Sequence, residues 1–209
     1  MPSIVNILCH DIVGYQMHNL ICMTTPSNCQ FCDPKAIADK IFHKTRNFYC
    51  IYNHKPVLPG HSLVIPKRHT ESILDLSDKE LREISKLMRE MSAILMEAYG
   101  GTGVDLTIQD GVVAGASVAH THMHVVPRRA GDITGDPSLW FTKIIEAEKS
   151  RTTLSNKEMK ENVKKIKLVI KKRKFAERQK KADKSRTATH DKAGSTKTEN
   201  VENPSTVAG

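Results

Sequence analysis

The feature that most constrains the fold is a segment of nine residues in which side chains of two kinds alternate. It runs from Val118 to Val126 and contains His120, His122 and His124. Because successive side chains of a β-strand point to opposite faces, a strand would place the three imidazoles on one face and the residues between them on the other. The alternation therefore predicts one strand of a half-buried sheet, which we expect to end at Pro127.

Three imidazoles on one face are a poor choice for a hydrophobic core but can carry chemistry. A neutral imidazole near pH 7 is a good nucleophile toward phosphorus, provided that an acceptor holds its far nitrogen and donors surround the phosphate oxygens. The pattern therefore predicts a nucleophilic site for phosphate chemistry. A chance cluster among the ten histidines of the chain, and a simple metal site, are the alternatives.

The region before this segment predicts a mixed domain of helix and strands. A helix begins after Ser77, which forms a capping box with Glu80, and it ends at Gly100. Its apolar residues recur every three to four positions, as on the buried face of an amphipathic helix. Residue types that favour strands predict further strands at 46–52, 61–66 and 104–109.

Both ends of the chain differ from this central region. Residues 1–28 form a poorly determined leader that lacks the basic start and the apolar stretch of a signal peptide. Residues 138–149 fit a short helix and residues 155–184 fit a longer one, rich in Lys and Glu. Beyond Lys184 the chain has almost nothing to bury, so we expect disorder. The predicted divisions are the leader over 1–28, a domain over 29–150 and a basic tail over 151–209.

The positive charge of the chain belongs to this tail. Residues 151–209 contain 17 Lys and Arg against 7 Asp and Glu, whereas residues 1–150 contain 15 against 16. The cluster Lys171–Lys174 fits a nuclear-import signal or a weak, nonspecific contact with nucleic acid, and a solvated charged helix is the alternative. The net charge therefore says nothing about the catalytic region.

Apolar runs and cysteines bear on where the chain works. No apolar run reaches the roughly 18 residues needed to span a bilayer, so we expect no membrane partner. The five cysteines are an odd number and all lie in the first quarter of the chain, which argues against a disulfide framework. We expect reduced thiols in a cytosolic protein, or in a nuclear one if the basic cluster is an import signal.

Two stretches of the sequence resemble one protein family. The triad of histidines followed by two apolar residues is similar to the histidine-triad (HIT) superfamily, and residues 109–132 resemble its fragile-histidine-triad branch. Upstream, Asn53 to Pro66 resembles the first conserved block of that family. The resemblance covers about residues 40–135. It implies an α+β fold with an antiparallel five-stranded sheet and two helices, paired into a homodimer, and a nucleotide as the substrate.

The resemblance also implies a reaction. His122 would attack the α-phosphate of a dinucleoside polyphosphate and form a nucleotidyl-histidine, from which water releases a nucleoside monophosphate. A divalent cation would accompany the substrate phosphates. The sequence departs from the family at Ala116, where the family usually has Gln. The implied substrate contacts are His124 and Ser117 to phosphate oxygens, Gln109 beside the leaving group, Asn53 to the ribose and His61 in support of the triad.

The pair Cys29 and Cys32 is a weak metal signal by itself. Some HIT proteins and related nucleotidyltransferases bind structural zinc through such a pair, a histidine after a Pro-basic-basic stretch and the first histidine of the triad. The resemblance therefore implies a zinc site formed by Cys29, Cys32, His69 and His120, a ligand set that suits tetrahedral Zn²⁺. Two unbonded thiols in a loop are the alternative, in which case His120 would orient its neighbour in the triad.

Three functions stay open on these grounds. The first is an asymmetric hydrolase of dinucleoside polyphosphates, of the diadenosine triphosphate or tetraphosphate type. The second is a phosphorylase of the same nucleotides, and the third is a nucleotide-binding signalling protein whose complex matters more than turnover. A phosphoramidase is disfavoured by Pro127 and Arg128 after the triad, and an aprataxin-like hydrolase by the lack of any cysteine after Cys50. We therefore expect the hydrolase.

Overall fold

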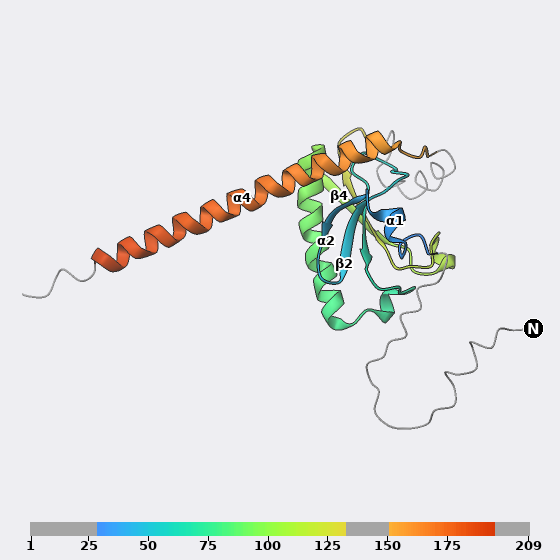
Figure 1. Ribbon diagram of the computed structural model, residues 1–209, viewed down its shortest axis with the longest axis horizontal. Helices are drawn as coiled ribbons and strands as arrows, with labels where there is room; N and C mark the ends of the chain where they lie inside the picture. Colours follow the sequence, from blue (N-terminus) through green and yellow to red (C-terminus); the bar gives the residue numbers. More distant parts are fainter. Residues whose placement is uncertain (1–28, 133–150, 195–209) are drawn as a thin grey trace, which may run out of the picture.

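Five antiparallel strands form one sheet in the computed structural model, which describes residues 29–132 and 151–194 (Figure 1). Their order across the sheet is β1-β2-β3-β5-β4, so that β5 lies between β3 and β4. This confirms the five-stranded antiparallel sheet. The leader and the helix expected over 138–149 lie outside the described residues. The strands are β1 (Ile41–Lys44), β2 (Phe48–Tyr52), β3 (Ser62–Pro66), β4 (Gly103–Ile108) and β5 (Met123–Arg128).

The predicted central helix is α2 (Asp78–Tyr99), and its ends are those that the sequence indicates. The Ser77 hydroxyl accepts from the Glu80 amide, and the Glu80 carboxylate accepts from the Ser77 amide, so the capping box is complete. At the other end Gly100 has a φ of 67°, a left-handed conformation that glycine adopts without steric cost. Local chemistry therefore sets both ends of this helix.

Two short elements were not anticipated from the sequence. One is α1 (Pro34–Ile37), and the other is the edge strand β1. Both have four residues, too few for a period to stand out from chance. Two single turns of 3-10 helix lie in connections of the fold. The first, η2 (Ile73–Asp75), lies between β3 and α2, and the second, η3 (Val112–Ala114), lies between β4 and β5.

The expected strand over 118–126 is wrong at both ends, because β5 begins at Met123 and continues through Pro127 to Arg128. Before Met123 the backbone leaves the ladder, since the Thr121 amide donates to the carbonyl of Thr70 at 2.6 Å. Pro127 pairs with Val104 of β4 on one side, and its ring lies toward Gly60 on the other, where β3 pairs with β5 only as far as Val125. The missing N–H of the proline therefore breaks no ladder bond. Of the three histidines, only His124 lies in the strand.

The two faces of the sheet bury different clusters. On one face, alternate residues of the strands pack under α2 and the first half of a long C-terminal helix, α4 (Asn156–Gly194). The opposite face carries a smaller cluster with Phe31 and Ile37 from the N-terminal segment that contains α1. Because β2 contributes Cys50 to the first cluster and Ile51 to the second, the period of two along a strand separates the faces.

The first part of α4 belongs to the core of the domain, although it was assigned to the tail. Met159, Val163, Ile166 and Ile170 are buried in the same cluster as α2. The division at residue 150 stays a prediction, but the hydrophobic core includes residues on both sides of it. Beyond the body the helix projects outward to Gly194, ten residues past the expected end at 184 (Figure 1).

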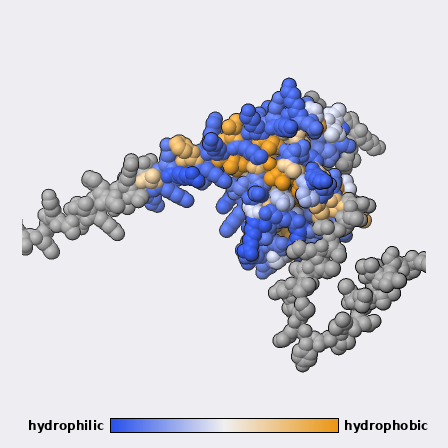
Figure 2. Space-filling model, viewed as in Figure 1, coloured by the Kyte–Doolittle hydropathy of each residue, from blue (hydrophilic) through white to orange (hydrophobic). Residues whose placement is uncertain are grey.

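Hydrophilic side chains dominate the visible surface of the coloured part of the molecule, and hydrophobic patches lie among them (Figure 2). The basic cluster Lys171–Lys174 of α4 follows the buried Ile170, and Arg173 in it pairs with Glu97 of α2 at 2.6 Å. The proposed roles of this cluster in nuclear import or contact with nucleic acid, and the cytosolic location, stay predictions. Within 29–132 and 151–194, none of the helices combines the length and the hydropathy that a bilayer crossing requires.

Candidate active site

A cavity of about 360 Å³ lies on the sheet face opposite α2. Its floor includes Ile51 and Leu63, and its walls come from the ends of β4 and β5 and from the loop after β2. All six residues that the sequence suggested for catalysis and substrate binding line this one cavity. They are Asn53, His61, Gln109, Ser117, His122 and His124.

His122 is held by the backbone next to it. Its Nδ1 atom lies 2.7 Å from the carbonyl oxygen of His120, and a carbonyl can only accept, so Nδ1 carries the proton. The Nε2 atom is then left with its lone pair, as a nucleophile requires. The side chain is buried, and this burial lowers the pKa of His122 below its usual value. The imidazole is therefore neutral near pH 7.

A chain of hydrogen bonds fixes the tautomer of His124. The Val57 amide donates to Nδ1 of His61 at 3.2 Å, so the proton of His61 resides on Nε2. That Nε2 lies 2.8 Å from Nδ1 of His124, which must accept, so His124 carries its own proton on Nε2. This last N–H is buried and has no partner among the described residues. The arrangement therefore offers one buried donor to a ligand in the cavity.

Burial also keeps this second pair of imidazoles uncharged. It lowers the pKa of His61 well below its usual value, and the charges of His124 and Arg151 add to this effect. Burial likewise lowers the pKa of His124 to about 4, with contributions from His122 and Arg151. Neutral imidazoles can form the donor–acceptor chain, whereas two protonated ones would place two donors face to face.

The loop after β4 brings the other two polar groups to the cavity. Asp110 anchors its start, because the carboxylate accepts from the Ser72 hydroxyl at 2.7 Å and from the Ile73 amide at 3.3 Å. Further along, a Cβ atom on Gly115 would lie 2.7 Å from Nε2 of Gln109, and its φ of 95° is left-handed. Glycine at this position therefore leaves space for the Gln109 side chain.

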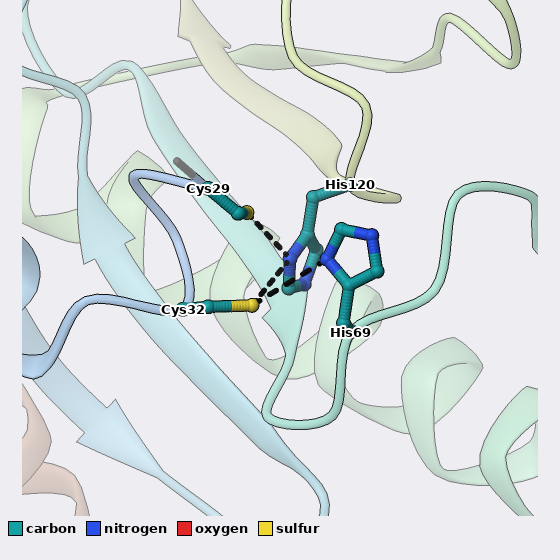
Figure 3. A group of neighbouring side chains, drawn as sticks. All are labelled: Cys29, Cys32, His69 and His120. Atoms are coloured by element: carbon teal, nitrogen blue, oxygen red, sulfur yellow. Dashed lines mark hydrogen bonds between the residues drawn. The ribbon is translucent and has the colours of Figure 1, made fainter. Parts of the chain in front are cut away.

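Cys29, Cys32, His69 and His120 meet beside the cavity, although they come from three separate segments (Figure 3). Nδ1 of His120 lies 3.3 Å from Sγ of Cys29 and 3.5 Å from Sγ of Cys32, and Nδ1 of His69 lies 3.5 Å from Sγ of Cys32. A tetrahedral Zn²⁺ with ordinary bond lengths would separate sulfur and nitrogen ligands by roughly 3.6 Å. The cluster therefore fits a tetrahedral metal ion.

The outer nitrogens of the two histidines have acceptors of the kind that support metal ligands. Nε2 of His120 lies 3.0 Å from the carbonyl oxygen of Pro66, and Nε2 of His69 lies 3.5 Å from a carboxylate oxygen of Glu71. Such contacts leave the Nδ1 atoms deprotonated and turned toward the sulfurs. Burial and the neighbouring Cys29 raise the pKa of Cys32 to about 11, which a bound cation would oppose.

Several residues at the cavity were missed by sequence reasoning. The ring of Phe31 lies 5.6 Å from that of His120 and 5.4 Å from that of His122, between the metal cluster and the triad. One of them is His54, which lines the cavity. So do Lys40, Lys55 and Arg151, which no pattern in the sequence indicated.

A family model and several known proteins match this chain. Residues 35–131 match the HIT domain. The chain is 36% identical over 120 residues to a bis(5'-adenosyl)-triphosphatase of Dictyostelium discoideum, a match that covers 57% of this chain and 78% of that protein. It is 31% identical over 120 residues to the asymmetrical bis(5'-nucleosyl)-tetraphosphatase of Schizosaccharomyces pombe, covering 57% of this chain and 64% of that protein, a little less than two thirds of its length.

A solved structure shares the fold. The crystal structure of the Plasmodium falciparum diadenosine triphosphate hydrolase in complex with cyclomarin A aligns with a TM-score of 0.53 and 28% identity. The alignment covers 64% of this chain and 78% of that one. The described sheet and its helices therefore share the fold of that hydrolase.

Proposed function

Because the chain belongs to the HIT domain family, we propose that it hydrolyses dinucleoside polyphosphates of the diadenosine triphosphate or tetraphosphate type and releases a nucleoside monophosphate. The names of its relatives support this substrate class. The observation that carries the proposal is the pair of imidazoles in the cavity. His122 presents a free Nε2 lone pair, and His124 presents a buried N–H without a partner among the described residues.

In the first step of the proposed reaction, Nε2 of His122 attacks the α-phosphorus. A P–N bond forms, and the bond from this phosphorus to the bridging oxygen breaks, so that the remaining nucleotide leaves with the electron pair as a phosphate anion. The imidazole becomes a cation that still donates its Nδ1 proton to the carbonyl of His120. This fixed acceptor stabilises the charge that develops on the ring.

In the second step, water attacks the same phosphorus and the P–N bond breaks. The nucleoside monophosphate departs, the proton of the water is lost to solvent, and His122 returns to its neutral form. The buried N–H of His124 donates to the phosphate oxygens in both steps, where negative charge develops. Ser117 adds a further contact to the phosphate, Gln109 orients the leaving group, Asn53 holds the ribose and His61 fixes His124, as their positions in the cavity support.

We also propose that the cluster of Cys29, Cys32, His69 and His120 holds a structural zinc ion. The two-sulfur, two-nitrogen donor set and its spacing support this assignment. The ion would tie the N-terminal segment to the loop before β5. A divalent cation that accompanies the substrate phosphates is a separate proposal, and the dependence of turnover on added Mg²⁺ after chelation tests it.

Diadenosine tetraphosphate is the substrate that tests the proposed function. In phosphate-free buffer we expect AMP and ATP in equal amounts, the products of asymmetric hydrolysis. A phosphorylase would instead require inorganic phosphate and release ADP with ATP. Tight binding without turnover in either buffer would contradict an enzyme and favour the signalling protein. Parallel reactions with diadenosine triphosphate compare the two chain lengths.

We further propose a homodimer that forms along β4. This strand lies at one edge of the described sheet, and Leu106 on it is 43% exposed. A shallow apolar hollow that includes Met88 and Met96 of α2 lies beside Leu106. A second copy that pairs along this edge would bury both features. The mass in solution by light scattering tests the proposal, with Leu106→Lys expected to shift the protein to a monomer.

A further inference from the structure

The cavity is lined by cations and by no carboxylate among the described residues. Lys40, Lys55 and Arg151 line it, together with four histidines. A cavity with one sign of charge attracts ligands of the opposite sign, because its low-dielectric walls concentrate the field. The lining therefore favours an anion with several charges.

Arg151 is unusual among these cations because it lies outside residues 35–131, which match the family. It reaches the cavity from the segment that precedes α4. The Leu154 amide donates to the carbonyl of His54 at 2.9 Å, and Nη1 of Arg151 lies 3.4 Å from the carbonyl oxygen of Lys55. The loop after β2 and the segment before α4 therefore lie side by side at the cavity.

The packing of α4 fixes this position. Ser155 accepts from the Glu158 amide at 3.3 Å, and the Glu158 carboxylate accepts from the Ser155 amide at 2.8 Å, so a capping box starts the helix immediately after Leu154. One turn later, Met159 is buried in the core. The helix thus anchors the segment that carries Arg151 beside the cavity.

Arg151 also acts electrostatically on histidines of the cavity. After burial, the charge of Arg151 is among the causes that lower the pKa values of His61 and His124. It has the same effect on His54, again after burial and together with Lys40 and Lys55. Arg151, which lies beside Lys55 in the wall of the same cavity as His61 and His124, therefore disfavours a positive charge on the donor chain that ends at His124.

We propose that Arg151, with Lys55 beside it, binds phosphate groups of the leaving nucleotide and selects substrates whose leaving group is an anionic phosphate chain. This specificity role rests on the proposed function and deepens it. A guanidinium presents several donors in a plane and matches phosphate oxygens better than an ammonium group does. Substrates with an uncharged leaving group would gain nothing from this contact.

Two substrates and three variants test the proposal. Diadenosine triphosphate has an anionic leaving group, whereas adenosine 5'-phosphoramidate releases uncharged ammonia once its nitrogen is protonated. We expect Arg151→Gln to lower kcat/KM for the dinucleotide about tenfold or more, the size of a lost charged hydrogen bond. The phosphoramidate should change less than about threefold. Arg151→Lys should recover part of the loss. Arg173→Gln, which removes an equal charge outside the cavity, should behave as the unaltered protein on both substrates.

A purely structural role for Arg151 would give a different pattern. If it only clamps the carbonyl of Lys55, then Arg151→Gln would lower both activities by the same factor and lower the melting temperature. Equal losses, or no loss with the dinucleotide, would overturn the proposal. A selective loss with an unchanged melting temperature supports it.

A measurement of binding at equilibrium tests this proposal separately from the proposed function. In a His122→Asn background, which stops turnover, titration with AMP and with ATP measures how much affinity the additional phosphates contribute. Arg151→Gln should reduce the affinity for ATP at least about tenfold and leave that for AMP nearly unchanged. Equal weakening of both nucleotides would contradict the assignment. If the unaltered protein fails to hydrolyse dinucleotides, the proposed function is wrong, and this binding arm still decides the role of Arg151.

Discussion

The Nδ1 atom of His122 lies 2.7 Å from the carbonyl oxygen of His120, and the ring of His120 is in turn part of the four-residue metal cluster. The group that fixes the nucleophile is therefore a backbone carbonyl of the residue that would hold the metal. Because His120 is 1% exposed and its Nε2 contacts the carbonyl of Pro66, its position is set by the core as well as by the cluster.

Replacing His122 with Asn should abolish turnover of dinucleoside polyphosphates. An amide cannot provide the free Nε2 lone pair, but it fits the same space and can still donate to the carbonyl of His120. We therefore expect unchanged folding by circular dichroism and nucleotide affinity within about threefold, a difference well under 1 kcal/mol. Retained turnover in His122→Asn would show that another group attacks the phosphorus.

The purified protein should contain one zinc ion per chain, measured by elemental analysis. Cys32→Ser removes one of the sulfur ligands, so we expect loss of the metal and a lower melting temperature. Turnover should fall as well, because His120 supplies both a ligand of the metal and the carbonyl that orients His122. Cys50→Ala is the matched control, because Cys50 is buried in the core on the opposite face of the sheet. This variant should retain its zinc. A zinc-free unaltered protein would contradict the assignment.

Ile166 should contribute to the stability of the whole domain, although it lies in the predicted tail. It is fully buried under the sheet, so Ile166→Ala should lower the free energy of unfolding by about 2–5 kcal/mol. Leu168 on the same helix is 50% exposed, and Leu168→Ala should change the free energy of unfolding by no more than about 0.5 kcal/mol. Chemical denaturation measures both. Equal effects would mean that α4 does not pack on the domain in solution.

The stability contributed by Glu80 should depend on pH. Its hydrogen bond from Arg68, at 2.8 Å, is the largest of the effects that lower the pKa of Glu80 from 4.5 to about 2. A lowered folded-state pKa means that the stabilisation is complete above about pH 4.5 and is lost as the pH falls toward 2. Glu80→Gln should therefore lower the melting temperature at pH 7, and the difference should shrink below pH 4.5. A difference that stays constant down to pH 3 would exclude the ion pair as its cause.

Sequence reasoning worked best where neighbouring residues decide the structure. The capping box of Ser77 and Glu80 and the left-handed Gly100 fix α2 with contacts inside four residues, so both ends were predictable. The strand over 118–126 was wrong because alternation describes side chains and not backbone pairing. The Thr121 amide donates to Thr70, some fifty residues earlier in the chain, and no local pattern contains that information.

For this protein, the sequence alone determined the chemical groups: three alternating histidines, a pair of cysteines and the polar residues that resemble the HIT family. It could do so because short motifs specify residue types at fixed spacing. Only the tertiary structure decided that α4 completes the core, that the four metal-binding candidates converge and that Arg151 reaches the cavity. These contacts join distant segments, as between Lys55 and Arg151, which are 96 residues apart. Such proximity depends on how the whole hydrophobic core packs, and no local spacing encodes it.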